Sequence, residues 1–573
     1  MNRNVESHFS DLPAAEIQRS IFDRSSTHKT SFDVGYLIPI YVDEVLPGDS
    51  FKMESSKVVR LQTMLTPIMD NMYLDTYFFF VPNRLVWTHW KEFMGENTDS
   101  AWIPQNTYTV PTIAAPSGGW NVGTIADYFG IPTGVAFSNS TDIRVSALPF
   151  RAYALICNEF FRDQNVTDPL NITLTDSNQT GSNGSSYIND VANGGIPFKV
   201  AKYHDYFTSC LPSPQKGPTV TVNLANQKAP VFTFNEQVPD YRSSAGPSIA
   251  PLIASYGPSP VYDKIGISPA NSTDWLEGRP YQGASSYANA LSQNWLNGMY
   301  PENLWADISA AAGISINELR LSFQLQKFYE KQARGGSRYI EVLKSHFGVT
   351  SPDARLQRPE YLGGNRIPLN VHEVTNSAQS TQDFLGDLGA KSATSDVHYD
   401  FEKSFTEHGF IIGLCCVRYD HSYPQGLERF WNRRNFYDYY WPVFANIGEQ
   451  PVRKAEIYAN LTNITRVDLQ DPNSTPIFGY QEAWAEYRYK PDRVSGEMRP
   501  GISNTLASWH LSDYYTSSPS LSDSWIREDK TNVDRVLAVQ SSAANQVFAD
   551  FYFKCIATRP MPMYSIPGLI DHH

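Results

Sequence analysis

The residues best suited to chemistry in this chain are arginines interleaved with aromatic side chains in one short segment. Arg429, Arg433 and Arg434 alternate there with Phe430, Trp431 and further aromatic residues. Guanidinium groups bind phosphates and aromatic faces stack on unpaired bases, so this pattern could hold single-stranded DNA. The same residues could form a protein interface through burial and cation–π contacts. We favour packing within or between subunits over DNA contact.

A second set of basic residues lies in the middle of the chain. From residue 316 to residue 368 there are nine Lys or Arg against five Asp or Glu, whereas residues 219–315 hold four against seven. If one of these regions faces DNA, it is therefore the first. The alternative is a solvated helix face. The candidates are Arg320, Lys327, Lys331, Arg334 and Arg338.

Sequence motifs for catalysis or metal binding are missing. The chain has no Gly-x-x-x-x-Gly-Lys-Ser/Thr loop, no His-Glu-x-x-His and no Gly-x-Ser-x-Gly. His372-Glu373 and His398 stand alone, and we interpret them as surface or hydrogen-bonded residues. The five cysteines form no Cys-x-x-Cys pair and are interpreted as buried free thiols. We predict no enzyme, no catalytic residue and no cofactor, and leave a bound metal open.

The elements that position these residues begin with strand-like segments near both ends of the chain. Residues 72–80 are largely apolar at both even and odd positions, which suits a sheet packed on both of its faces. Strands at both termini with few between them suit a two-sheet sandwich into which the middle of the chain is inserted. The segments are 34–42, 58–65, 72–81, 408–419, 480–489 and 545–557.

We therefore predict a mainly β protein, an eight-stranded antiparallel jelly roll with long, partly helical loop insertions. Residues 1–33 are polar and predict an N-terminal arm, and residues 34–573 form the jelly-roll domain. Within it, residues 219–315 contain nine prolines and predict a surface insertion. Helices are predicted over 150–161, 315–332 and 339–347.

Composition points to assembly and away from a DNA coat or a membrane. Aromatic residues make up 13% of the chain, and they are enriched in interfaces. The net charge of −13 argues against a uniformly DNA-binding surface but allows one basic face. The N-terminus has no apolar signal core and the longest apolar run, 410–417, is of strand length. We expect neither secretion by that route nor membrane insertion.

Five long segments also resemble one protein family, the major capsid protein of gokushoviruses, small single-stranded DNA phages of the Microviridae. These segments are 69–87, 199–216, 323–339, 429–442 and 480–500, so the resemblance spans the chain. It implies the jelly roll of viral capsids and a T=1 icosahedral shell of identical subunits, with a circular single-stranded DNA genome on its inner face. Residues 219–315 would then form an exterior protrusion.

The same resemblance implies partners and a location. They are scaffolding, pilot and DNA-packaging proteins, a receptor on the host cell surface, assembly in the host bacterial cytoplasm, and a final place in the virion. Two other classes stay open. A β-sandwich carbohydrate-active enzyme or lectin would show a concave site with paired carboxylates, and a single-stranded DNA-binding module would show steeply salt-dependent affinity.

Overall fold

The computed structural model describes residues 17–96, 108–134, 144–218, 316–377, 385–460 and 476–564, with residue 220 and seven short strands between 231 and 306. The chain forms two compact units. One combines Met1–Gly217 with Tyr329–His573, and the other is Pro218–Phe328. The second unit overlaps the predicted insertion, 219–315. Its short strands pair antiparallel: β9 (Val231–Thr233), β10 (Tyr241–Ser243), β11 (Ile253–Ser255), β12 (Lys264–Ile267), β13 (Leu276–Gly278), β14 (Met299–Pro301) and β15 (Leu304–Ala306).

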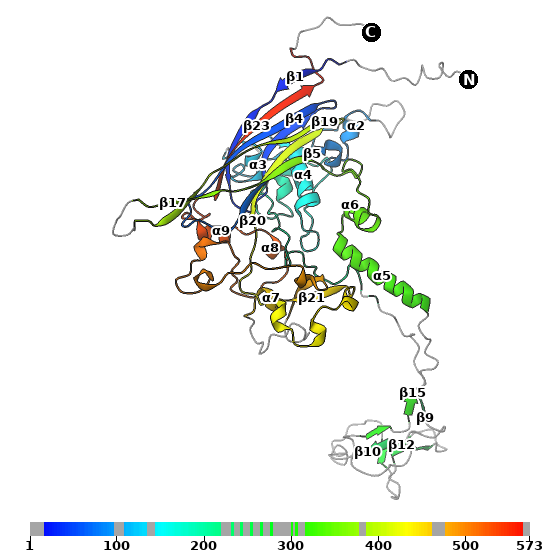
Figure 1. Cartoon of the computed structure of the whole chain (residues 1–573). Coiled ribbons are helices and arrows are strands. Elements are labelled where there is room, and N and C mark those ends of the chain that lie inside the picture. The colour runs from blue at the N-terminus through cyan, green and yellow to red at the C-terminus, as the bar shows by residue number, and fades with distance from the viewer. Residues whose placement is uncertain are drawn as a thin grey trace, which may run out of the picture. The chain divides into compact units, whose positions relative to one another are not determined.

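The first large sheet joins the two ends of the first unit (Figure 1). In it, β23 (Val547–Arg559) lies between an edge formed by β1 (Ser20–Asp23) and β2 (Ser26–Phe32) and the strand β4 (Ser50–Leu61), and β19 (Thr394–Ser404) forms the other edge. All pairs are antiparallel. Since β1 and β2 follow one continuous register along β23, they can be counted as one strand or two.

The second large sheet has the order β16 (Glu360–Pro368), β5 (Met72–Pro82), β20 (Gly409–Tyr419) and β3 (Ile38–Val45), again antiparallel. Its inward side chains and those of the first sheet form one hydrophobic core, to which Phe78, Phe80, Phe551 and Phe553 belong. The predicted mainly β, two-sheet sandwich is confirmed. The number of eight strands stays a prediction.

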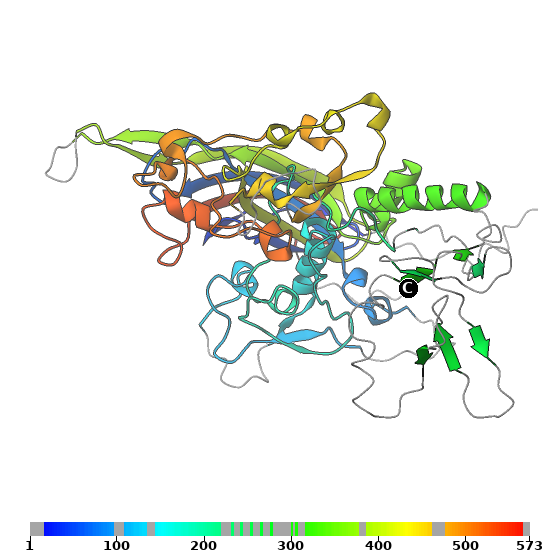
Figure 2. The ribbon, with the colours of Figure 1, turned by 90° about the horizontal axis from the view of Figure 1, so that it is seen from below.

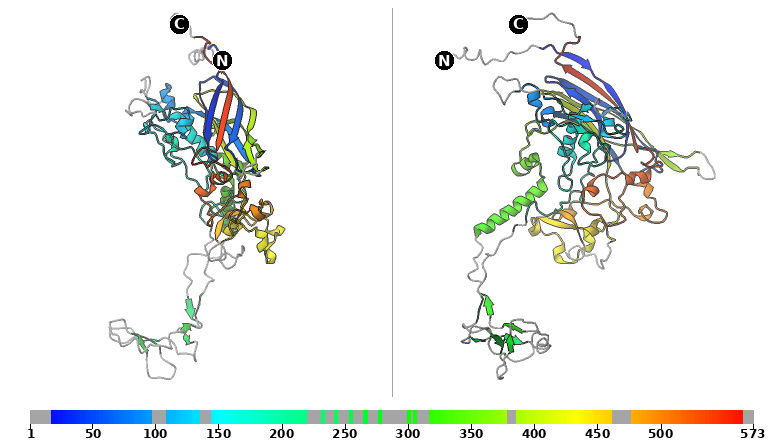
Figure 3. Two further views of the ribbon diagram at one scale, coloured as in Figure 1. Left: turned by 90° about the vertical axis from the view of Figure 1, so that its left-hand side faces the viewer. Right: turned by 180° about the vertical axis from the view of Figure 1, so that it is seen from behind.

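The outer face of the second sheet is covered as well. Phe79 of β5 and Ile412 of β20 join a second core with α4 (Leu148–Ile156), and Tyr153 of this helix donates a 2.7 Å hydrogen bond to the carbonyl of Leu37. Figure 3 shows the cyan segment that contains α4 to one side of the strands. This third layer explains why both faces of β5 are apolar.

Four segments differ from the prediction. Residues 20–32 were assigned to the arm but form β1 and β2, because an edge strand exposes one face and so tolerates polar residues. The strands β16 and β19 lack an apolar signature. In β16 a Cβ on Gly364 would lie 2.0 Å from the carbonyl oxygen of Thr76, so only glycine allows this close pairing. The strand predicted at 480–489 is β22 (Ile477–Glu482), and Trp484 with φ 66° turns the chain away.

The remaining elements lie in the connections, which Figure 2 shows from below. The long connection from β20 to β23 carries the segment of alternating arginines and aromatic residues. No described helix is long and apolar enough to cross a membrane. The other elements are α2 (Trp90–Phe93), α3 (Ile125–Tyr128), α5 (Ile316–Gly335), α6 (Tyr339–Val342), α7 (Lys454–Ile457), α8 (Asp523–Ile526) and α9 (Thr531–Val536), with β6 (Thr112–Ala114), β7 (Arg144–Ser146), β8 (Gln179–Thr180), β17 (Val371–Thr375), β18 (Leu388–Ser392) and β21 (Glu449–Arg453).

Candidate assembly surface

The arginine and aromatic segment folds as three short helical turns, Arg429–Asn432, Phe436–Asp438 and Pro442–Phe444. The buried carboxylate of Asp438 accepts hydrogen bonds from the backbone amides of Arg434, at 2.7 Å, and Asn435, at 2.8 Å. These bonds satisfy donors that a short helical turn leaves free. These hydrogen bonds fix the backbone of the segment and use none of its arginine or aromatic side chains.

Arg429 points inward and is neutralised inside the subunit. Its guanidinium lies 2.7 Å from the carboxylate of Glu456, and both side chains are buried. Burial by itself would lower the pKa of Arg429, but Glu456 outweighs burial and raises it. Glu456 also accepts a hydrogen bond from Tyr206. With its charge balanced and its side chain buried, Arg429 is a structural residue of this subunit.

Arg433 and Arg434 differ from each other in their exposure to solvent. Arg433 donates to Glu486 at 3.2 Å and lies over the ring of Tyr487, with 4.2 Å from guanidinium carbon to ring centroid. Arg434 is exposed. Of the three arginines of the segment, Arg434 alone therefore presents its charge to solvent.

The aromatic side chains of this segment point outward. Trp431 is 66% exposed and Phe430 40%, and their ring centroids lie 4.6 Å apart. Solvent exposure of so many large rings on a monomer marks an interaction site. We call the following set the aromatic surface: Phe430, Trp431, Phe436, Tyr437, Tyr439, Tyr440, Trp441, Val443, Ile447 and Tyr487.

Of the second set of predicted basic residues, three are exposed to solvent and two form ion pairs. Arg320, Lys327 and Lys331 are exposed on α5. Arg334 instead pairs with Glu449 and donates to Gln481 at 2.7 Å. Arg338 pairs with Glu341 at 3.3 Å and donates to two backbone carbonyls. DNA contact stays a prediction for each of these five residues.

Arg338 lines a cavity of about 790 Å³, and other arginines and aromatic rings also line it. In its wall the ring of Tyr203 lies between the guanidinium groups of Arg366 and Arg418, 4.3 and 4.2 Å from the ring centroid. Both guanidinium groups pair with the buried carboxylate of Asp75, at 2.6 and 2.5 Å. The charges of this wall are thus largely used within the subunit.

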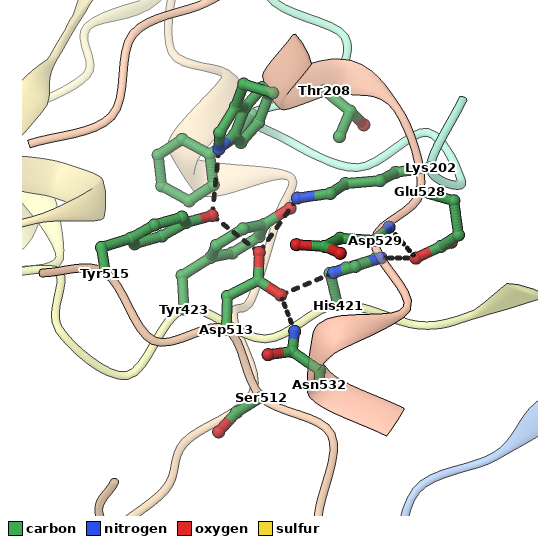
Figure 4. A network of polar contacts seen from close by, with 12 residues as sticks. Lys202, Thr208, His421, Tyr423, Ser512, Asp513, Tyr515, Glu528, Asp529 and Asn532 are labelled. Carbon is green, nitrogen blue, oxygen red and sulfur yellow. Dashed lines mark hydrogen bonds and ion pairs between the residues drawn. The ribbon is translucent and has the colours of Figure 1, made fainter. Parts of the chain in front are cut away.

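A buried charge network joins His421, Asp513 and Glu528, which lie in the same long connection as the aromatic surface, to Lys202 from an earlier part of the chain (Figure 4). His421 lies between two buried carboxylates, with Nδ1 2.8 Å from Asp513 and Nε2 2.9 Å from Glu528. Lys202 pairs with the other oxygen of Asp513 at 3.0 Å. Because both ring nitrogens face acceptors, the imidazole needs both protons. Burial opposes the charged ring, but Glu528 and Asp513 outweigh it and raise the pKa of His421 to about 9.

Packing connects this network to the aromatic surface. Asp513 accepts a hydrogen bond from Tyr515, which accepts one from Trp525. The Trp525 ring belongs to a third hydrophobic core that also contains Tyr206, the partner of Glu456. The network thus anchors the residues that hold Arg429. None of this was visible in the sequence, because Lys202, His421, Asp513 and Glu528 come from four distant segments.

The histidines and cysteines singled out in the sequence are not gathered into one group in the described part of the chain. In the described part of the chain no three His, Cys, Asp or Glu residues are grouped as metal ligands. His398 donates to or accepts from Asp400 at 3.1 Å, as a hydrogen-bonded histidine does, and His372 is exposed. All five cysteines are buried free thiols. The residues gathered at the aromatic surface are suited to binding a partner.

Comparison with known proteins gives the family of this chain. The family model described as "Capsid protein (F protein)" matches residues 10–569. The chain belongs to this capsid protein family. Capsid proteins assemble into shells of many subunits. As a capsid protein, the chain is a structural component of the virion.

Individual relatives of this capsid protein agree. The capsid protein VP1 of Spiroplasma virus 4 is 44% identical over 551 residues, covering 95% of this chain and 94% of that protein. VP1 of Chlamydia phage 1 is 39% identical, and VP1 of Bdellovibrio phage phiMH2K is 37% identical, each covering 99% of this chain and 98% of the relative. The resemblance to Microviridae capsid proteins is confirmed.

The charge network predicts that the capsid subunit loses stability in mild alkali. A histidine whose pKa is raised by folding stabilises the fold fully below its unfolded pKa of about 6.5, and this stability is lost as the pH rises towards 9. From about pH 6 to about pH 8 we expect the free energy of unfolding to fall by about 2 kcal/mol. Urea unfolding at both pH values measures it. A His421→Gln variant should lose this slope and a His398→Gln variant should keep it; an unchanged stability in the unmodified protein would contradict the prediction.

Proposed function

We propose that this capsid protein is the repeated subunit of a T=1 icosahedral shell around a circular single-stranded DNA genome, and that its aromatic surface contacts neighbouring copies. One observation carries the proposal: in one segment two arginines are paired inside the subunit, whereas the aromatic rings are exposed to solvent. Arg429 and Arg433 are neutralised by Glu456 and Glu486, while the rings beside them are exposed. A segment that binds phosphates would need these guanidinium groups to be free and exposed as well.

Repeated burial of this surface supplies the driving force for a closed shell. Aromatic residues bury large areas at small entropic cost, and each copy would present the same surface. Closure by symmetry then leaves no exposed aromatic surface to promote aggregation.

Contact with the genome needs solvent-exposed cations on an inner face. Arg434, Arg320, Lys327 and Lys331 are exposed and are the residues that we propose for this role. With a net charge of −13 for the chain, such contacts must be confined to part of its surface. Scaffolding, pilot and DNA-packaging proteins, and assembly in the host cytoplasm, complete the proposal.

We further propose that the part of the unit Pro218–Phe328 that precedes α5, residues 219–315, projects from the outer surface of the shell and takes part in attachment to a host receptor. Its support is twofold. It belongs to a separate compact unit inserted between two parts of the sandwich unit, and residues 219–315 have an acidic balance of four Lys or Arg against seven Asp or Glu, which suits a surface turned away from DNA.

Electron microscopy of the expressed protein, together with its mass from light scattering, tests the proposal. We expect uniform hollow shells, or pentameric precursors that form shells when assembly factors are added. A monomer that never assembles and is absent from particles would refute it. If that monomer bound or cleaved glycans, the β-sandwich lectin or carbohydrate-active enzyme would replace it.

A further inference from the structure

Arg151 of α4 is buried in an unusual way. The whole residue is 2% exposed, and its guanidinium donates 3.1 Å hydrogen bonds to the carbonyls of Val86 and Thr175. Among the described residues no carboxylate lies within ion-pair distance of it. Asp176 attracts it from farther away, but its carboxylate is held by Trp87 at 2.6 Å and His89 at 2.9 Å. Buried charges are normally paired, so this one calls for a counter-charge.

A cavity adjoins this guanidinium. Its volume is about 250 Å³, and its other polar lining side chains are Asn171, Thr173, Gln179, Asn189 and Asn193. Amide and hydroxyl groups donate hydrogen bonds to anions, and Arg151 has three N–H donors beyond the two used for carbonyls. At ~30 Å³ per water, the cavity has the volume of about eight waters. A carboxylate or phosphate group fits in it with several waters.

We propose that this cavity binds a small oxyanion, a carboxylate or phosphate group, as the counter-charge of Arg151. The anion would join α4 to the loop 171–193, whose Asn171 and Asn189 side chains bond each other at 2.6 Å. Burial without a carboxylate partner also lowers the pKa of Arg151 to about 10, and an anion in the cavity would reverse that shift. The site does not depend on shell assembly, because every residue named belongs to one subunit.

Thermal unfolding of the full-length protein tests the site. Phosphate at roughly ten times its Kd should raise Tm by about 1 °C over chloride of equal ionic strength. Arg151→Gln should abolish this rise. Arg535→Gln is the matched control, since Arg535 also donates to backbone carbonyls but does not line the cavity, and it should keep the rise.

Further measurements with other anions identify the bound group. A second variant keeps the test usable if the first variant does not fold. Acetate replaces phosphate in one arm and a short oligothymidylate in another; an Arg151-dependent rise with the oligonucleotide alone would assign the site to a DNA phosphodiester. If Arg151→Gln does not fold, a double variant with Thr173→Ala and Asn193→Ala, which removes two other polar side chains of the cavity wall, should lose most of the rise. No rise with any anion, or the same rise in the cavity variants, would overturn the proposal.

Discussion

Replacing Asp513 by asparagine is expected to lower the free energy of unfolding by about 3–5 kcal/mol. Asp513 faces two buried cations, Lys202 at 3.0 Å and His421 at 2.8 Å, and asparagine has the shape of the side chain but not its charge. Both cations would then remain in the interior with only Glu528 to balance them. The attraction of the two cations holds the pKa of Asp513 well below its usual range, opposing burial, which would raise it. Urea unfolding at about pH 6, where His421 is protonated, gives the measurement.

An exposed ion pair provides the control for this experiment. Glu402 lies 3.6 Å from Lys52, and both side chains are more than half exposed. Glu402→Gln removes one charge from a pair that water already screens, so the free energy of unfolding should change by less than about 1 kcal/mol. If Asp513→Asn cost no more than Glu402→Gln, the network would not be the anchor that the structure indicates.

Shell assembly is expected to fail when Trp431, Tyr437 and Val443 are all replaced by serine, while the isolated subunit stays folded. These side chains are 66%, 69% and 81% exposed, so their loss removes little from the core. At an interface each buried aromatic anchor contributes about 2 kcal/mol or more, and the loss would recur at every contact of the shell. Light scattering and electron microscopy would show subunits or small oligomers in place of shells, with an unchanged Tm for the subunit.

A second triple variant, with two aromatic residues and one valine replaced on other parts of the surface, is the control. Val122, Tyr339 and Phe347 are 78%, 67% and 74% exposed and lie outside the aromatic surface. Their replacement by serine should leave shells intact. Equal loss of assembly in both variants would show that the contact is not specific to the aromatic surface.

The strands β5 and β16 are neighbours, but only β5 can be recognised from its sequence. The double-sided apolar pattern of β5 is local, and it correctly indicated a sheet packed on both faces. Its neighbour β16 has glycines and polar residues, because it pairs closely with the backbone of β5 and contributes few side chains to the core. Period and hydrophobicity therefore reveal the central strands of a sandwich, while edge strands such as β2 and β16 become visible only once their partners are placed.

Local patterns and the long family-like segments sufficed to predict the β-sandwich, the helical segments that contain α4, α5 and α6, and the membership in a capsid family. They could not separate Arg429 from Arg434, which stand in the same run of arginines and rings. Tertiary structure separated them by bringing Glu456 to one and leaving the other in solvent. The reason is physical: side-chain periodicity acts over a few residues, whereas the pairing of a buried charge depends on groups that the fold brings from distant segments.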